Sequence, residues 1–425
     1  MNNRLENTIG LIGVVLVLAL GGLLLGSASL ALRLVFGVGL GYALTRGYMG
    51  FAGSVNRSYQ TGSTRLMRAL MLMFCVTAAL SIAVLYGKDA ASYDLWVNPI
   101  NFGLILGGVL FGFGMTFSSC CASGVLTDIV TGLPRAAITL LFFGMGVFLG
   151  FPIQSTASWV TDSWFTSPVG EQLYGGVYLP DLFAWDGFGG YLGAMLLTLA
   201  LAAVVVALSK LYEKKRSNAG TLTAVPSEQL QEDAKGNDDL SNYSPLSART
   251  YERFFVKPWS LTTGAIVISG IFTLMMGITK MGWGASTPYG FWFGKFLMIF
   301  GVSPEALASF STKPEAVYTM PFFQHPINVQ NIGIILGTIL ALLLAGDFVK
   351  TVKAGLKIRP LEAVLFAMGG ILMGLGTRFA NGCNVGSLYT PIANFSLSGW
   401  VFLAFLVLGG VLGNMVAKRF TKTCC

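Results

Sequence analysis

The chain has 425 residues, of which 54% are hydrophobic and only 11% are charged. Soluble domains carry about 25% charged residues, so this composition excludes a soluble globular protein and indicates an integral membrane protein. The net charge of +8 comes without any module that interleaves basic and aromatic residues, so nucleic acid is not an expected partner. The basic residues are instead expected to orient the chain in a lipid bilayer.

Long apolar runs along the chain predict transmembrane helices, because a helix needs about 20 apolar residues to cross the hydrocarbon. The first run follows one early basic residue, Arg4, and has no small-residue cleavage site, so it is interpreted as a retained helix and not as a signal peptide. The prediction is an all-α, multi-pass membrane protein with about ten spans, at residues 8–30, 31–45, 66–86, 99–118, 136–153, 190–211, 260–282, 329–347, 361–380 and 396–417.

A polar stretch, 212–258, separates the sixth and seventh expected spans. Its acidic and basic residues lie among serines, asparagines and glycines, a composition typical of flexible linkers. The linker divides the chain into a first transmembrane half, 1–211, and a second half, 259–425.

Lys and Arg residues near the ends of spans mark the cytoplasmic side of a membrane protein. They gather in 46–65, at the start of the linker, in 348–360 and at the end of the chain, whereas 154–189 contains none and 283–328 contains two. This distribution agrees with ten spans and predicts that both termini lie in the cytoplasm.

One pattern, G-G-x3-G-x-G-x2-F-x3-C-x2-G, occurs twice, at 107–124 and at 369–386. All seven matched positions are displaced by the same 262 residues, which indicates a duplication. With the orientation above, the first motif helix runs inward and the second outward, so the repeats 31–153 and 260–417 are expected to be inverted. The alternative is a parallel duplication with a miscounted helix. Inverted repeats are typical of transporters and place the substrate site where broken helices meet near the midplane.

Each motif cysteine is followed by a segment too short to cross the membrane, 122–133 or 384–395, which is expected to form a re-entrant half-helix. The N-terminus of such a half-helix presents free N–H groups and a positive dipole end, which suit an anion. Cys121 and Cys383 are expected to face one another there. As protonated thiols they would offer a weak donor and a polarizable acceptor to a sulfur-bearing anion. The alternative is that both simply pack as small residues.

Arg378 lies five residues before Cys383 in an otherwise apolar helix, where a buried charge is costly and usually functional. The equivalent residue of the first copy is Thr116, so duplication does not account for the charge. The alternative is that Arg378 reaches the membrane interface or pairs with a C-terminal carbonyl. Asp128 is a candidate partner or gate but is expected at the cytoplasmic rim beside Arg135. The candidate residues for contact with a transported anion are Cys121, Cys383, Arg378, Gly124, Asn384 and Gly386.

The remaining cysteines and the single histidine carry less information. Cys75 lies in an apolar run and is expected to pack as a small hydrophobe, and Cys120 is replaced by a glycine in the second copy. Cys424 and Cys425 end the chain and are expected to form an unstructured tail. His325 stands alone in a loop, and no metal-ligand spacing appears, so neither a metal nor a cofactor is expected.

The strings GGVLFGFGMTFSSCCASG (107–124) and GGILMGLGTRFANGCNVGSLYTPIANFSLSGW (369–400) resemble the paired signatures of the YeeE/YedE sulfur-transport family. The string GVGLGYALTRGYMGFAGSVNR (37–57) is similar to a third, looser signature. Members are bacterial inner-membrane proteins linked to thiosulfate uptake. The resemblance implies an hourglass-shaped bundle with re-entrant helices, in which cysteines pass thiosulfate along by transient hydrogen bonds, and it assigns those roles to Cys121 and Cys383.

One position departs from the family pattern. The third family cysteine belongs near Gly50, where this chain has glycine, which implies a wider passage and leaves open another small sulfur or selenium species as substrate. The resemblance also implies a small cytoplasmic sulfur carrier of the TusA type as a candidate partner.

The resulting hypothesis is an importer of a small sulfur-containing anion, thiosulfate first. It is not an enzyme, and no ATP-binding loop is present to drive it. The rivals are a membrane thiol sulfurtransferase or redox relay, and a non-transporting scaffold for a sulfur carrier.

Overall fold

The computed structural model describes residues 3–118, 120–234, 244 and 247–421. Within these ranges the chain folds into helices without strands, and nine helices are long and apolar enough to cross a membrane. The predicted all-α, multi-pass architecture is therefore confirmed. The ten expected spans correspond to α1 (Asn3–Leu24), α2 (Ala28–Gly47), α4 (Arg65–Leu85), α5 (Phe102–Ser118), α7 (Leu133–Thr156), α11 (Tyr191–Asn218), α14 (Leu261–Thr279), α18 (Pro326–Ala345), α20 (Pro360–Phe379) and α22 (Leu397–Thr421).

The boundary between the first two spans lies earlier than predicted. Helix α1 ends at Leu24 and α2 begins at Ala28, whereas the apolar pattern placed the break after residue 30. Gly26 has a φ of 62°, a left-handed conformation that a right-handed helix cannot continue through. Hydropathy could not locate this break because apolar residues lie on both sides of it.

Short helices follow several of the long ones. The two expected after the motif cysteines are α6 (Gly124–Thr131) and the pair η4 (Asn384–Tyr389) and α21 (Thr390–Ala393). Two more, α3 (Phe51–Thr61) and α15 (Thr287–Met298), were not predicted as half-helices. Each repeat therefore holds a full helix, a half-helix and a full helix, and then the same order again.

Helices α5 and α20 carry the two motif copies and pack directly against each other. A Cβ atom at Gly107 would lie 2.6 Å from the carbonyl oxygen of Gly376, and one at Gly114 would lie 2.7 Å from that of Gly369. The two contacts are equivalent, because exchanging the motif copies replaces Gly107 by Gly369 and Gly376 by Gly114. Early residues of α5 meet late residues of α20, so the helices are antiparallel. The repeats are therefore inverted, as predicted, and the parallel alternative is wrong.

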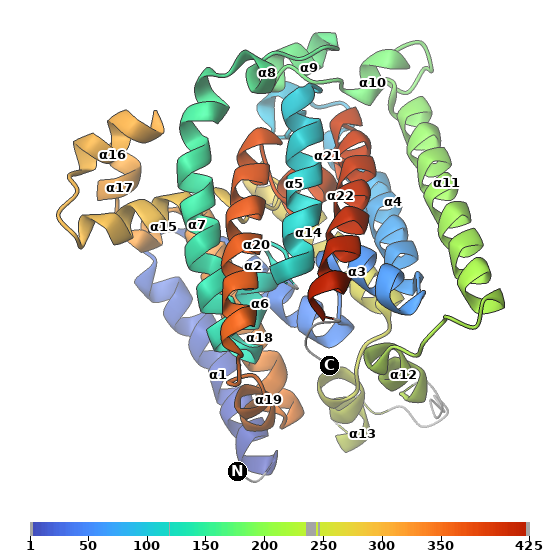
Figure 1. Cartoon of the computed structure of the whole chain (residues 1–425), viewed down its shortest axis with the longest axis vertical. Helices are drawn as coiled ribbons and strands as arrows, with labels where there is room; N and C mark the ends of the chain where they lie inside the picture. The colour runs from blue at the N-terminus through green and yellow to red at the C-terminus, as the bar shows by residue number, and fades with distance from the viewer. Residues whose placement is uncertain (1–2, 119, 235–243, 245–246, 422–425) are drawn as a thin grey trace.

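The same exchange relates the neighbouring helix pairs, since α5 packs on α22 as α20 packs on α7, and α2 packs on α18 as α14 packs on α4. A Cβ atom at Gly112 would lie 2.1 Å from the Leu406 carbonyl oxygen, and one at the equivalent Gly374 would lie 2.5 Å from that of Phe143. Small residues allow this close approach of backbones in membranes. Helices α1 and α11 stand outside the symmetric bundle at opposite sides (Figure 1).

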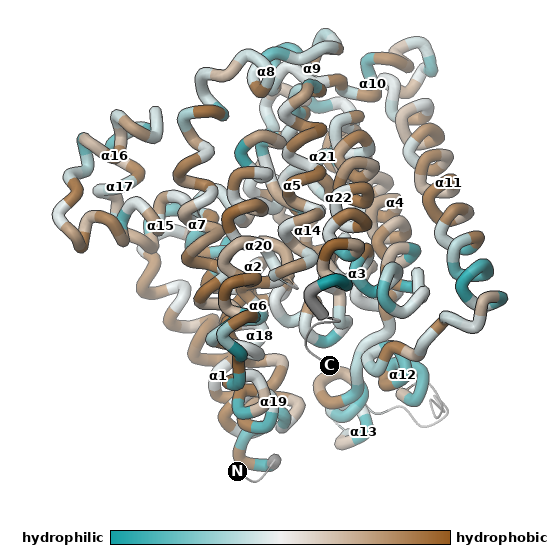
Figure 2. Tube along the Cα trace, viewed as in Figure 1, coloured by the Kyte–Doolittle hydropathy of each residue, from teal (hydrophilic) through white to brown (hydrophobic). Residues whose placement is uncertain are grey.

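The two ends of the molecule differ in what covers them. Both chain ends, with α12 (Pro226–Asp233), α13 (Ala248–Tyr251) and α19 (Phe348–Ala354), lie at one end, and α8 (Ser158–Thr161), α9 (Pro168–Leu173) and α10 (Leu179–Leu182) lie at the other (Figure 1). Figure 2 shows hydrophobic residues along the outer helices and hydrophilic ones gathered around α12, α13 and the adjoining end of α11. The remaining short elements are η1 (Ala90–Ser92), η2 (Glu252–Val256), α16 (Pro304–Ser311), α17 (Ala316–Thr319) and η3 (Phe322–Gln324).

Part of the stretch predicted as a linker is helical and anchored. Helix α11 continues to Asn218, and α12 docks beneath the break between α2 and α3. The Gln231 side chain donates to the backbone oxygens of Gly47, at 3.0 Å, and Trp259, at 2.8 Å. Composition did not reveal this docking because these polar residues have specific partners in distant segments.

Candidate functional site

A cavity of about 580 Å³ lies at the end of the molecule that carries α19. We call it the inner cavity. Its walls come from the α2–α3 break, the α5–α6 break and the end of α18. Gly50, Cys120, Cys121, Ser123 and Gly124 all line it. One motif cysteine and the position of the missing family cysteine therefore share one space.

Cys121 stands where α6 begins. Its sulfur accepts the backbone N–H of Gly124 at 3.4 Å and lies 3.4 Å from the Ser123 hydroxyl, and the residue is only 1% exposed. Helix α6 starts at Gly124 with Ser123 before it, so its N-terminal end faces the inner cavity. Such an end favours negative charge.

Gly50 stands where α3 begins, on the same cavity. It has a φ of −104° and a ψ of 122°, which is extended backbone open to any residue. A Cβ atom there would meet no other atom within 4 Å. Close packing therefore does not require this glycine, and its main effect is to leave the cavity wider.

Two arginines bring positive charge to the inner cavity. Arg46 is 7% exposed and Arg57 is half-buried, and both line the cavity. In the described part of the chain, Arg46 Nε and one terminal nitrogen of Arg57 have no hydrogen-bond partner. Asp128 also lines the cavity, but it is paired with Arg135 at 2.9 Å, as predicted.

Cys383 occupies the equivalent place in the second repeat and is also 1% exposed. The backbone N–H groups of Val385 and Gly386 and the Ser286 hydroxyl lie close enough to interact with its thiol. Helix α15 begins directly after Ser286. Cys383 therefore lies near the start of α15, a half-helix of its own repeat. Cys121 likewise shares the inner cavity with the start of α3, the equivalent half-helix of the first repeat.

The two residues expected beside Cys383 have different surroundings. Asn384 is fully buried, with its amide nitrogen 3.7 Å from the Met115 sulfur and its amide oxygen without a partner among the described residues. Gly386 lies under the Trp96 ring, where a Cβ atom would come within 2.5 Å of the ring. Asn384 offers an unused polar group, whereas Gly386 is required by packing.

Arg378 is 2% exposed and donates to neutral groups only. Its guanidinium lies 3.3 Å from the Gln154 side-chain oxygen, 3.5 Å from the Ser286 hydroxyl and 3.4 Å from the Thr287 hydroxyl. Among the described residues its hydrogen-bond partners are all side chains, so the alternative of pairing with a C-terminal carbonyl is wrong. The charge is held inside the protein next to the start of α15.

Tyr289 of α15 lies between the two thiol regions and was missed by the sequence analysis. Its hydroxyl donates to the Ala122 backbone oxygen at 2.6 Å, in the α5–α6 break. It interacts electrostatically with Cys383, Cys121 and Cys120. The segment was overlooked because the apolar stretch 289–302 is too short and interrupted for a full span.

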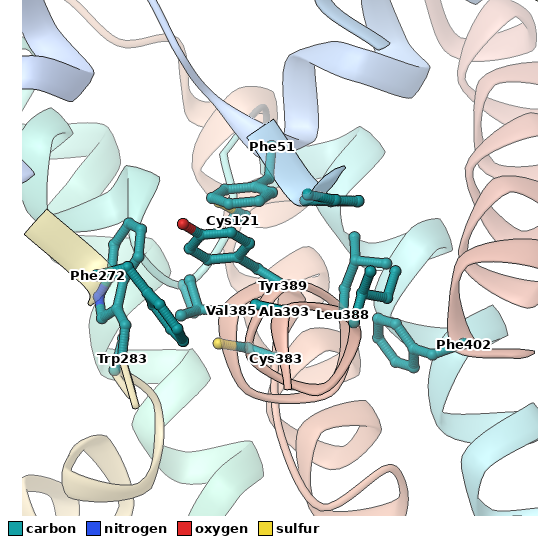
Figure 3. Packing of buried hydrophobic residues seen from close by; sticks show 14 of the residues in the cluster. Phe51, Cys121, Phe272, Trp283, Cys383, Val385, Leu388, Tyr389, Ala393 and Phe402 are labelled. Carbon is teal, nitrogen blue, oxygen red and sulfur yellow. The ribbon is translucent and has the colours of Figure 1, made fainter. Parts of the chain in front are cut away.

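Both thiols belong to one buried cluster. Figure 3 shows Cys121 and Cys383 in the same packed group as Phe51, Trp283 and Tyr389, side chains that come from both repeats. The sequence-predicted residues thus fall into two groups around this cluster. Cys121 and Gly124 face the inner cavity, whereas Cys383, Asn384, Gly386 and Arg378 lie beyond it.

Cys120 lines the inner cavity beside Cys121. Cys75 is half-buried in α4, and Cys424 and Cys425 lie outside the described residues. Among the residues that the structure describes, no group of three or more His, Cys, Asp or Glu side chains could hold a metal ion.

Comparison with known proteins adds to this geometry. A sequence family described as sulphur transport matches residues 46–412. The chain is 26% identical over 317 residues to the thiosulfate transporter TsuA of Spirochaeta thermophila, covering 73% of this chain and 77% of that protein. It is 23% identical over 381 residues to the thiosulfate transporter TsuA of Escherichia coli, covering 88% and 91%. The probable transporter YedE of Escherichia coli is 28% identical over 171 residues, covering 40% and 39%.

Proposed function

The chain belongs to the sulphur transport family, and we propose that it imports a small sulfur-containing anion, thiosulfate first, by way of Cys121 and Cys383. The similar proteins named as thiosulfate transporters support this substrate. The membrane would be the bacterial inner membrane, with both termini in the cytoplasm. The inner cavity would then open to the cytoplasm, where a TusA-like sulfur carrier is a candidate acceptor.

One observation carries the proposal, namely that equivalent thiols of two inverted repeats belong to one buried cluster, with Cys121 also lining the inner cavity. Cys121 ends the inner cavity, and Cys383 lies past it beside the buried charge of Arg378. An anion arriving from outside would meet Arg378 and Cys383 first, and then Cys121. The Cys121 sulfur already accepts the backbone N–H of Gly124, which leaves its thiol proton to donate to an anion.

The thiols can bind without forming a covalent bond. A protonated thiol is a weak donor, which suits a substrate that must leave again. Full thiolates would repel an anion, so both cysteines are proposed to act as protonated thiols. The positive charge comes instead from arginines and half-helix N-termini, which remain fixed while the anion moves.

The space that Gly50 leaves in the inner cavity affects which substrates can pass. Where the family pattern has a third cysteine, this chain has open space. A related sulfur species or a selenium compound is therefore the second candidate substrate for the same path.

The test is growth of a bacterium that cannot import sulfate or thiosulfate, with thiosulfate as the sole sulfur source. The chain should restore growth, and Cys121→Ala and Cys383→Ala should each abolish it at unchanged protein levels. Cys75→Ala is the matched control, because this thiol lies in α4 away from the path, and it should grow like the wild type. Growth of both site variants would refute transport through the paired thiols.

Two further outcomes separate the rivals. A persulfide or disulfide found on Cys120 or Cys121 by mass spectrometry after turnover would favour a sulfurtransferase or redox relay. The inserted protein could instead fail to support growth on thiosulfate and yet take up selenite or another sulfur compound. That compound would then be the substrate in place of thiosulfate.

A further inference from the structure

Two basic side chains share one aromatic ring beyond the inner cavity. The Arg378 guanidinium carbon lies 5.4 Å from the centre of the Phe151 ring, and the Lys313 amine lies 5.2 Å from it. Because both distances end at the same point, the two charges are at most 10.6 Å apart. Phe291 stacks on this same ring at 5.3 Å and 19°. We call Lys313 and Arg378 the outer cation pair.

No acidic side chain neutralises this pair. Among the described residues, neither Lys313 nor Arg378 forms an ion pair with Asp or Glu. Lys313 donates to the Ser155 hydroxyl at 3.4 Å, and Arg378 donates only to neutral groups. Burial and the neighbouring Arg378 lower the pKa of Lys313. Buried cations without a counter-ion are costly, and a bound anion would remove that cost.

The outer cation pair leads directly to the second thiol. The Ser286 hydroxyl lies 3.5 Å from Arg378 and also contacts Cys383. Lys313, in contrast, lies between α16 and α17, outside the spanning helices, and is partly exposed. One cation can therefore meet an ion arriving in solution, and the other holds it next to the thiol.

We propose that Lys313 and Arg378 form a capture site for small dianions at the outer entrance, which delivers them through Ser286 to Cys383. The order of steps rests on the proposed import, but the binding itself does not. Two cations without a carboxylate favour an ion of charge −2 over one of charge −1, because a dianion interacts with both at twice the strength. Thiosulfate and sulfate belong to this class, whereas nitrate and chloride do not.

Kinetics of thiosulfate uptake into proteoliposomes tests the capture site. Lys313→Gln removes the charge and keeps a polar end that can hydrogen-bond, on a side chain one atom shorter. It should raise KM roughly five- to tenfold, as expected for a charge-assisted contact partly screened by solvent, and leave the maximal rate unchanged. Lys313→Arg should restore the wild-type KM. The matched control is Lys88→Gln, which removes an exposed lysine just after α4 and should change neither constant.

The effects of salt and of competing anions distinguish a charge interaction of Lys313 from a purely structural role of this residue. The KM difference between wild type and Lys313→Gln should shrink at high ionic strength, because salt screens exposed charges. Sulfate should compete with thiosulfate in the wild type and compete less in Lys313→Gln, while nitrate should compete weakly with both. Equal salt dependence in the two proteins would contradict the proposal.

Equilibrium binding separates this inference from the proposed import. Sulfate and thiosulfate would be titrated calorimetrically into purified wild-type, Lys313→Gln and Cys383→Ala proteins. Lys313→Gln should lower the affinity for both ions five- to tenfold, and Cys383→Ala should leave the affinity for sulfate unchanged. A wild-type protein that binds dianions through Lys313 but imports none would refute the import and keep the capture site. Equal affinities of wild type and Lys313→Gln would refute the capture site, even with import intact.

Discussion

The replacement Gly50→Leu tests whether the inner cavity lies on the transport path. The substitution should be tolerated structurally, since the backbone of Gly50 is extended and a Cβ atom there would meet nothing within 4 Å. Gly50 precedes the first turn of α3, and an apolar residue at that position costs at most about 1 kcal/mol. The four added carbons would enter the space that Gly50 shares with Cys121. An increase of about 1.4 kcal/mol in the transport barrier already slows uptake tenfold, so we expect uptake to fall at least that far.

The assay is initial uptake of labelled thiosulfate into proteoliposomes, with melting temperature as the check on folding. Gly270→Leu is the matched control, because a Cβ atom at Gly270 also meets nothing within 4 Å but lies on α14 and not in the cavity lining. Gly50→Cys should still transport and should become blocked by a bulky thiol reagent added from the α19 side. Wild-type rate and KM in a folded Gly50→Leu protein would show that the ion does not pass this cavity.

Two further changes test the packing around the site. Gly112→Ala would place a Cβ atom 2.1 Å from a backbone oxygen of α22, forcing the helices apart by about 1 Å and destabilising the protein by about 3 kcal/mol or more. Gly270→Ala, in open space, should instead stabilise the protein by up to about 1 kcal/mol. Equal melting temperatures of the Gly112→Ala and Gly270→Ala proteins would contradict the tight contact between α5 and α22. Gln231→Ala removes the bonds to Gly47 and Trp259, so the α12 amides should exchange with deuterium faster while uptake stays within about twofold. Unchanged exchange would show that these bonds do not anchor α12, and loss of uptake would favour the scaffold reading.

The amino-acid sequence was sufficient to predict the order of the long helices and their arrangement in two repeats. Apolar runs located the ten long helices, because only a long apolar helix satisfies its backbone inside a bilayer. The constant displacement between the two motif copies predicted a duplication with Cys121 and Cys383 as equivalent residues, and the distribution of Lys and Arg predicted that the repeats are inverted. The distribution of Lys and Arg predicted that the two termini share one side, and the structure places the start of α1 and the end of α22 toward the same end of the molecule (Figure 1).

The sequence alone could not locate two of the half-helices. Helix α3 follows α2 after a break at Gly50 and contains several polar residues, so its segment was assigned to the basic stretch 46–65. Helix α15 is amphiphilic and short, and its role becomes visible only through the contacts of Ser286 and Tyr289 with the first repeat and with Cys383. Such half-helices cross no membrane, so hydropathy contains no signal for them.

The sequence by itself determined that this protein spans a membrane, is duplicated and carries one thiol in each copy, because periodicity and composition encode those properties locally. Only the tertiary structure decided what the thiols meet. Lys313 and Phe151 lie 162 positions apart in the chain, and no local pattern links either of them to Arg378. They come together because glycine-lined helices pack closely enough to bring α7, α15 and α20 around one point. The surroundings of a buried charge are therefore set by the packing of distant segments and not by spacing in the sequence.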